Sequence, residues 1–106
     1  SSVGYVIPPL PYLAYLKMVA DKYDFLFIVD EVQNGMGRTG KQWAIEHAEV
    51  APDLLAMAKS LSNGLPLSAV TGRADIMDML APLGPVYQAG TFNGSPVSMA
   101  ASSWRV

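Results

Sequence analysis

FLFIVDEVQNGMGRTG, residues 25–40, joins an apolar run to two adjacent acids and then to a glycine-rich tail. The run 25–29 shows no alternation of apolar and polar residues, which predicts a strand buried on both faces, as in a parallel sheet flanked by helices. The strand stops at Asp30 and Glu31. Ligands of α/β sheets bind beyond the carboxyl ends of the strands, so we expect these acids to lie beside a ligand site.

Segments with helical and strand patterns alternate on both sides of this run. Residues 11–23 begin with a proline that suits a first helical turn and then repeat apolar residues at helical spacing. Two further apolar runs, 54–58 and 67–70, predict strands, and residues 41–48 and 74–80 predict short helices. This order of elements predicts an α/β fold.

The ends of the chain and one long connection lack such patterns. Residues 1–9 are predicted to form a strand end or a loop that two prolines close. Residues 81–96 hold three prolines and three glycines, too many for a regular element, which predicts a surface loop. Ser95 and Pro96 suit the start of a helix that continues through residue 104.

The domain organisation follows from how the apolar runs are spaced. No repeat, low-complexity stretch or interior linker divides the 106 residues, so we expect them to belong to one domain. Only short polar segments separate the apolar runs, which is typical of a piece whose apolar faces are covered by other parts of a larger fold. We therefore expect a fragment of a larger domain.

The composition narrows the classes of partner and compartment. A net charge of −2 and a pI of about 5.1 provide no basic patch for a phosphate backbone, which argues against nucleic acid. The longest apolar run is far shorter than the roughly 18 residues of a spanning helix, and we expect neither a membrane segment nor a signal peptide. The absence of cysteine excludes disulfides and thiolate metal sites. A cytoplasmic enzyme is consistent with these properties.

Lys59 is the first candidate for chemistry. It follows the apolar run 54–58 and precedes the polar segment SLSNG, so we expect it to be less solvated than a surface lysine. A poorly solvated amine loses its proton more readily, and only the neutral amine attacks a carbonyl to form a Schiff base. The alternative is a surface lysine whose stem packs on apolar neighbours while its amine reaches water.

The two acids leave other kinds of site open. Asp30 and Glu31 invite a metal, but no His or Cys lies near them in sequence, and paired-carboxylate glycoside chemistry stays open from spacing alone. Adjacent residues of a strand point to opposite faces, so if Asp30 faces a site, Glu31 points away from it. We expect His47 to be structural or exposed. The glycine-rich segment GMGRTG matches neither the dinucleotide fingerprint nor the phosphate-binding P-loop.

Three segments together carry a family resemblance: IVDEVQNGMGRTG (28–40), PDLLAMAKSLSNGLPLSAVTGR (52–73) and GTFNGSP (90–96). In this order they resemble class III aminotransferases, over residues 4–101. The resemblance implies the large domain of fold type I, with a mixed, mostly parallel sheet flanked by helices, and pyridoxal 5'-phosphate as the cofactor. It also implies that residues 1–106 are the central part of that cofactor-binding domain, without its N-terminal part and the small C-terminal domain.

The resemblance gives four residues a role at the cofactor. Lys59 corresponds to the lysine that forms a Schiff base with the cofactor and then moves the proton between the substrate's α-carbon and the cofactor. Asp30 corresponds to the carboxylate that pairs with the protonated pyridine nitrogen, which makes the ring an electron sink. Val32 corresponds to the side chain that packs on the ring, and period-two spacing places it on the face of Asp30. Gln33 corresponds to the amide that hydrogen-bonds the phenolic oxygen.

The remaining predictions concern assembly and the sheet edge. Thr91 corresponds to a threonine that reaches the phosphate of the neighbouring subunit's cofactor, so the resemblance implies a homodimer. We expect the strand ends at Asp30, at Lys59 and at residues 71–73 to meet at one edge of the sheet. Arg38 has the chemistry to bind a substrate carboxylate, but a structural role in its loop accounts for it equally well, and we leave it outside the predicted site.

The motifs divide between subclasses of the family. Residues 31–40 and 56–78 resemble 4-aminobutyrate and acetylornithine aminotransferases, which move an amino group from an amino acid or ω-amino acid to a 2-oxo acid or aldehyde. Residues 81–101 resemble glutamate-1-semialdehyde aminomutases, which move it within one molecule. A third interpretation is a non-catalytic truncated fragment or interaction module. No segment corresponds to the family's phosphate loop or ring-stacking aromatic, so we expect the 106 residues alone to be inactive.

Overall fold

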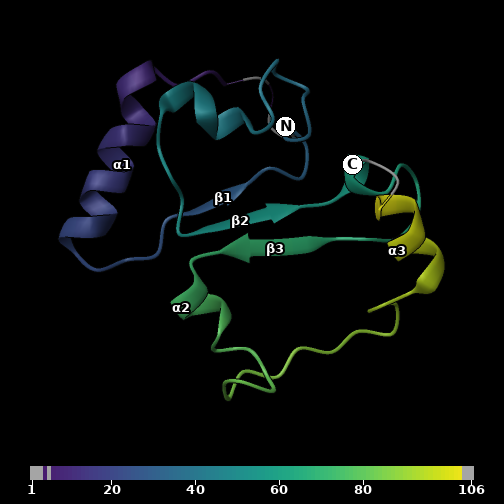
Figure 1. Cartoon of the computed structure of the whole chain (residues 1–106). Helices are drawn as coiled ribbons and strands as arrows, with labels where there is room; N and C mark the ends of the chain where they lie inside the picture. Colours follow the sequence, from purple (N-terminus) through teal and green to yellow (C-terminus); the bar gives the residue numbers. More distant parts are fainter. Residues whose placement is uncertain (1–3, 5, 104–106) are drawn as a thin grey trace.

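The fold is known from a computed structural model that describes residue 4 and residues 6–103 (Figure 1). One sheet holds three strands in the order β1 (Ile28–Asp30), β2 (Leu54–Met57) and β3 (Ala69–Gly72). Strand β1 runs parallel to β2, and β3 runs antiparallel to β2, so the sheet is mixed. The helices are α1 (Leu10–Lys22), α2 (Ala74–Met77) and α3 (Pro96–Ser103), together with the 3₁₀ turns η1 (Ala44–Ala48) and η2 (Lys59–Leu61).

The helices lie around the margins of the sheet. Figure 1 shows α1 and η1 together beyond β1, α2 beside β3, and α3 near the end of the sheet to which β2 points. The buried apolar residues are few: Ala20 of α1, Ile45 of η1 and Leu55 of β2. The small core therefore lies where α1, η1 and the central strand meet. An α/β arrangement with flanking helices is confirmed.

The predicted strand over residues 25–29 is shorter and later than expected. It begins at Ile28, and Phe25 and Leu26 precede it in irregular backbone. Burial on both faces is wrong for this chain, since the side chain of Ile28 is 58% exposed. Burial needs a second layer, and no described element packs over that face of β1.

The third strand differs from its prediction in position. The apolar run 67–70 predicted a strand two residues before the observed one, which ends at Gly72. A close approach explains the end: Gly72 pairs with Leu54, and a Cβ built on Gly72 would lie 2.2 Å from the carbonyl oxygen of Asp53. Glycine is required here because any side chain would push β3 away from β2.

Two of the predicted helices are confirmed, and the one predicted over residues 74–80 is shorter than expected, since α2 spans only Ala74–Met77. Helix α1 begins and ends one residue earlier than predicted, and α3 begins at Pro96 as expected, although residue 104 lies outside the described residues. The helix predicted over residues 41–48 starts only at Ala44. Trp43 is extended there, and its backbone N–H donates to Glu46 Oε1 at 2.8 Å, which sets the start of η1.

The segments predicted as loops contain little regular structure. Residues 81–96 form a connection whose one isolated bridge joins Leu80 to Val86, and residues 6–9 form no element. The rest of the predicted N-terminal loop lies partly outside the described residues. Within the described part of the chain, no helix is long and apolar enough to cross a membrane.

Candidate active site

The parallel pairing of β1 and β2 brings two predicted site residues to one edge of the sheet. Asp30 pairs in register with Ala56, so both strands end at the same edge. Lys59 lies two residues after the end of β2 and opens η2. Because parallel strands share their carboxyl ends, the carboxylate and the amine lie on the same side of the sheet, as predicted.

Lys59 has an unusual backbone conformation. Its φ is +45°, in the left-handed region that residues with a side chain seldom adopt. Hydrogen bonds from the backbone amides of Ser62 and Asn63 to the carbonyl oxygen of Lys59, at 3.3 and 3.2 Å, hold this conformation. Asn63, in the same turn, and three residues elsewhere in the described chain also have a positive φ, so this conformation shapes the turn and does not by itself mark Lys59 as functional.

A surface hollow of about 670 Å³, which we call the Lys59 hollow, lies at this edge. Gln33 and Arg38 line it together with Lys59. Its remaining lining residues are Val6, Ile7, Asn34, Thr39 and Ala44. A volume of this size suits a small-molecule ligand or cofactor. The structure thus brings Gln33 to Lys59 as predicted, and it adds Arg38, which the sequence left outside the site.

Asp30 and Glu31 differ in burial as the alternation predicted. Asp30 is exposed and lines an adjoining hollow of about 460 Å³ that shares Asn34 and Ala44 with the Lys59 hollow. Its Oδ1 accepts the backbone N–H of Val32 at 2.9 Å, and nothing else in the described part of the chain bonds to this carboxylate. Glu31 is only 2% exposed and points into the protein. One acid is therefore free to bind a ligand, and the other is not.

The prediction of a poorly solvated Lys59 is wrong for this chain. The lysine is exposed, because no described segment closes over the Lys59 hollow. Val32 is half-buried and lines neither hollow. Thr91 is exposed in a turn that the hydrogen bond from Asn93 N–H to Gly90 O closes at 3.0 Å, and the structure does not bring it to the Lys59 hollow.

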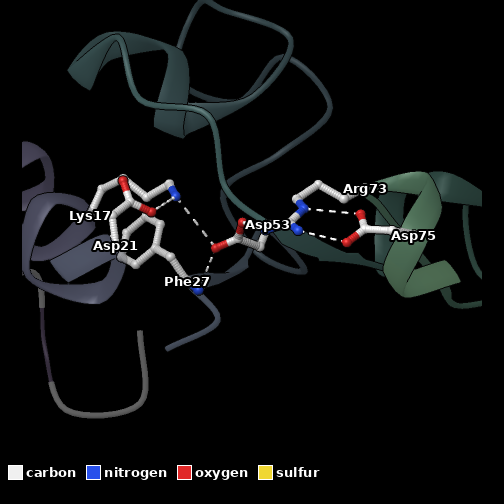
Figure 2. Close-up of polar contacts among 6 residues, drawn as sticks. All are labelled: Lys17, Asp21, Phe27, Asp53, Arg73 and Asp75. Atoms are coloured by element: carbon white, nitrogen blue, oxygen red, sulfur yellow. Dashed lines mark hydrogen bonds and ion pairs between the residues drawn. The ribbon is translucent and has the colours of Figure 1, made fainter. Parts of the chain in front are cut away.

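The expectation that residues 71–73 join the same edge is also wrong. Strand β3 is antiparallel to β2, so it ends beside the start of β2. Arg73 lies at this opposite edge, where its Nη1 atom is 3.0 Å from Asp53 Oδ1 (Figure 2). The direction of β3 is a property of its pairing with β2, and an apolar run does not reveal it.

Asp53 is the centre of a charged cluster that sequence reasoning missed (Figure 2). Its carboxylate is almost fully buried, accepts the backbone N–H of Phe27 at 2.8 Å, and pairs with Arg73 and, at 3.5 Å, with Lys17. The sequence patterns gave Asp53 no role. Its place directly before an apolar strand was the available signal.

The pKa values in this cluster follow from the pairing. The pKa of Asp53 is lowered, first by the hydrogen bond from the Phe27 amide and then by the hydrogen bond from Arg73. Asp75 raises the pKa of Arg73, and Arg73 lowers the pKa of Asp75. The pKa of Lys17 is raised, first by its hydrogen bond to Asp21. These charges satisfy one another, so the cluster stabilises the fold and offers no free group to a ligand.

The other candidates from the sequence give no site. His47 is exposed as expected, with Nε2 3.0 Å from the carbonyl oxygen of Thr39. Residues 4 and 6–103 contain no group of three or more acids and histidines that could hold a metal ion. Although both acids line the 460 Å³ hollow, Glu31 is buried and its Oε1 already accepts the Ile45 N–H, so Asp30 and Glu31 do not form the pair of free facing carboxylates that glycoside hydrolysis requires.

The family model described as aminotransferase class III matches residues 1–105. The chain belongs to this family, whose members use pyridoxal phosphate, and its three strands and flanking helices are a fragment of the fold-type-I large domain.

Two curated relatives show how varied the chemistry of similar proteins is. The chain is 50% identical over 99 residues to a leucine/methionine racemase from Thermococcus litoralis, a match that covers 93% of this chain and 22% of the relative. It is 42% identical over 100 residues to a glutamate-1-semialdehyde 2,1-aminomutase from Methanocaldococcus jannaschii, covering 94% of this chain and 23% of the relative. The chain therefore spans less than a quarter of the length of these relatives.

Solved structures of transaminases superpose closely on the chain. The ornithine aminotransferase from Plasmodium yoelii is 35% identical with a TM-score of 0.86, over 95% of this chain and 26% of that one. The ornithine aminotransferase from Toxoplasma gondii is 42% identical with a TM-score of 0.82, over 92% and 23%. An S-selective transaminase from Arthrobacter is 36% identical with a TM-score of 0.83, over 95% and 22%.

The side chains at the Lys59 edge fit this cofactor by their chemistry. An amine suits the aldehyde of pyridoxal phosphate, an exposed carboxylate suits its ring nitrogen, and an amide suits its phenolic oxygen. Lys59, Asp30 and Gln33 supply these three groups at one edge of the sheet.

Proposed function

We propose that the full-length protein transfers an amino group from an amino acid or ω-amino acid to a 2-oxo acid or aldehyde, with pyridoxal phosphate held by Lys59. The observation that carries this proposal is the position of Lys59. It opens the turn that follows β2, at the same edge as the free carboxylate of Asp30, and it lines one hollow with Gln33. Family membership supports the reaction class.

When bound, the cofactor supplies an electron sink that stabilises negative charge at the substrate's α-carbon. In this proposal the amine of Lys59 would hold the cofactor through its aldehyde group, and the free amine would accept and return the α-proton at Nζ. The carboxylate of Asp30 keeps the ring nitrogen protonated, because an adjacent negative charge favours the protonated form. Gln33 orients the ring through its phenolic oxygen, and Val32 packs on the ring face.

The proposal extends to the assembly of the full-length protein. Residues 1–106 are the central part of the cofactor-binding large domain, and the N-terminal part and the small C-terminal domain complete the site. Two subunits form a homodimer in which Thr91 of each reaches the phosphate of the other's cofactor. The exposure of Thr91 and its distance from the Lys59 hollow support a role in another subunit's site. The protein acts in the cytoplasm.

The test compares full-length wild-type protein with Lys59→Ala. We expect the substitution to abolish the cofactor's visible absorbance band and to lower amino transfer by about 10³-fold or more, as the loss of a covalent catalytic group does. Lys22→Ala, which removes an exposed lysine at the end of α1, is the matched control and should keep both. Retention of the band and of turnover in Lys59→Ala would overturn the proposal.

Two other reactions of the same cofactor have specific support. The tail 81–101 and the 42% identity to an aminomutase favour an intramolecular amino shift, and the 50% identity to a leucine/methionine racemase favours inversion at the α-carbon. Assays without any 2-oxo acid separate them. Conversion of glutamate-1-semialdehyde identifies the aminomutase, and loss of optical activity of L-leucine or L-methionine identifies the racemase. An aminotransferase carries out neither reaction, and it turns over only when an acceptor is added.

A non-catalytic role remains the alternative of another class. It requires that the full-length protein purify without a cofactor band even after incubation with pyridoxal phosphate. A band that disappears in Lys59→Ala would exclude this alternative.

A further inference from the structure

Glu31 is a buried acid that the proposed function leaves unused. Its side chain is 2% exposed, and Oε1 accepts the backbone N–H of Ile45 at 2.8 Å. The other oxygen, Oε2, is buried and has no hydrogen-bond partner among the described residues. An unpaired buried polar atom costs free energy, so the position of this side chain needs a reason beyond packing.

Hydrogen bonds of Glu31 hold the elements at both ends of the loop 32–43. Its backbone N–H donates to the carbonyl oxygen of Ala56 at 2.9 Å, and its carbonyl oxygen accepts the N–H of Gly35 at 3.0 Å. Its side chain then holds Ile45, 14 residues further along and inside η1. One residue therefore ties the end of β1, the first turn of the loop and the start of the next element together.

This loop contributes residues to the Lys59 hollow. Gln33 and Arg38 lie within it, and both line the Lys59 hollow. The loop is closely packed near Glu31, because a Cβ built on Gly35 would lie 2.8 Å from the carbonyl oxygen of Glu31 and 2.9 Å from the ring of Trp43. Gln33 lies two residues from Glu31, inside the turn that the hydrogen bond from Gly35 N–H to Glu31 O closes.

We infer that Glu31 is a positioning residue that holds Gln33 at the cofactor by tying its loop to η1; this inference rests on the proposed function. Glu31 acts through the acceptor that it offers to Ile45. A glutamine offers the same acceptor and places an amide nitrogen where the unpaired Oε2 lies. Glu31→Gln should therefore preserve the site, and Glu31→Ala should disturb it.

The experiment uses full-length protein and follows the cofactor's absorbance maximum, kcat and KM. In Glu31→Ala we expect a shifted maximum and a kcat lowered by about 10-fold to 100-fold, with the KM of the amino donor nearly unchanged, because a misplaced orienting group affects the reacting geometry. Glu31→Gln should restore the wild-type spectrum and kcat. Ile45→Ala is the matched control: it opens the same buried contact but keeps the backbone N–H that Glu31 binds. It should lower thermal stability and leave the spectrum unchanged.

Several outcomes would overturn the inference. A wild-type spectrum in Glu31→Ala, or an equal shift in Ile45→Ala, would show that Glu31 only packs. If Glu31→Gln is as impaired as Glu31→Ala, the acceptor that Glu31 offers to Ile45 is not what matters. If Glu31→Ala does not fold, Glu31→Leu fills the same volume without an acceptor and must show the same shift. Failure of the proposed function looks different, since wild-type protein would then show no band that depends on Lys59.

Discussion

The two edges of the small sheet each present an aspartate, and the two side chains are used in opposite ways. Asp30 ends β1 at the Lys59 edge, where it is exposed and accepts one local backbone hydrogen bond. Asp53 precedes β2 at the other edge, where it is 3% exposed, accepts the Phe27 amide and pairs with Arg73 and Lys17. The chemical group is the same, and only its surroundings differ.

The comparison teaches how to separate a binding carboxylate from a structural one. A carboxylate whose oxygens are already bonded cannot take a ligand without losing those bonds, whereas one that retains a free oxygen at a strand end can. The same rule applies to the cations: Arg73 is occupied by two acids, while Lys59 and Arg38 have no acidic partner among the described residues. The two edges differ less in which residues they carry than in whether their charged groups already have partners.

Among changes at the two aspartates and their partners, the largest effect should come from removing the charge of Asp30 at the open edge. In the full-length enzyme we expect Asp30→Asn to keep the cofactor but to lower amino transfer by roughly 10²-fold, because a charge that stabilises the reacting ring is lost. Steady-state kinetics with cofactor quantification measures both quantities. Asp24→Asn, a change at an exposed aspartate in the turn before β1, is the control and should leave amino transfer and bound cofactor unchanged. Wild-type turnover in Asp30→Asn would refute the assigned role.

The buried edge should respond in stability, not in turnover. We expect Asp53→Ala to lower the free energy of unfolding by about 1–3 kcal/mol, because the Phe27 amide loses its buried acceptor. Urea denaturation of the full-length protein measures this loss, and kcat should stay near the wild-type value. A fall in kcat without loss of stability would break the distinction between the two edges.

The pH dependence of the same edge follows from the lowered pKa of Asp53. The ionised carboxylate contributes its full stabilisation above the ordinary aspartate pKa of about 3.9, and this contribution disappears as the pH falls toward the lower folded-state value. Urea midpoints measured from pH 7 down to acid pH should therefore converge for wild type and Asp53→Asn. The substituted amide keeps an acceptor for the Phe27 N–H but carries no titrating charge. Parallel curves would contradict the role of the charge.

The smallest effect should come from the outer member of the cluster. Asp75 is exposed and pairs at 2.6 Å with Arg73, which is itself 54% exposed at its side chain. Solvent and salt screen such a pair, so Asp75→Ala should leave the urea midpoint almost unchanged, and any change should shrink further at high salt. A loss comparable to that of Asp53→Ala would show that the buried carboxylate depends on Asp75 to orient Arg73.

Much of the fold could be predicted because its signals are local. Helix α1, the start of α3 and strand β2 follow from apolar spacing and from prolines that suit a first turn. The predictions that were wrong share one cause, because each concerns a property that depends on residues far away in the chain. The exposure of Ile28 and Lys59 depends on whether another layer covers them, and the position of Arg73 depends on the direction of β3.

By itself, the sequence determined the family, the separation of Asp30 from Glu31 by strand periodicity, and the placement of Lys59 after a strand. Only the tertiary structure decided that Glu31 anchors the loop of Gln33 and that Asp53 joins Phe27 to Arg73. Those bonds span 14, 26 and 20 residues along the chain. Local patterns determine which side of an element a residue occupies, but the pairing of distant strands determines which groups meet there.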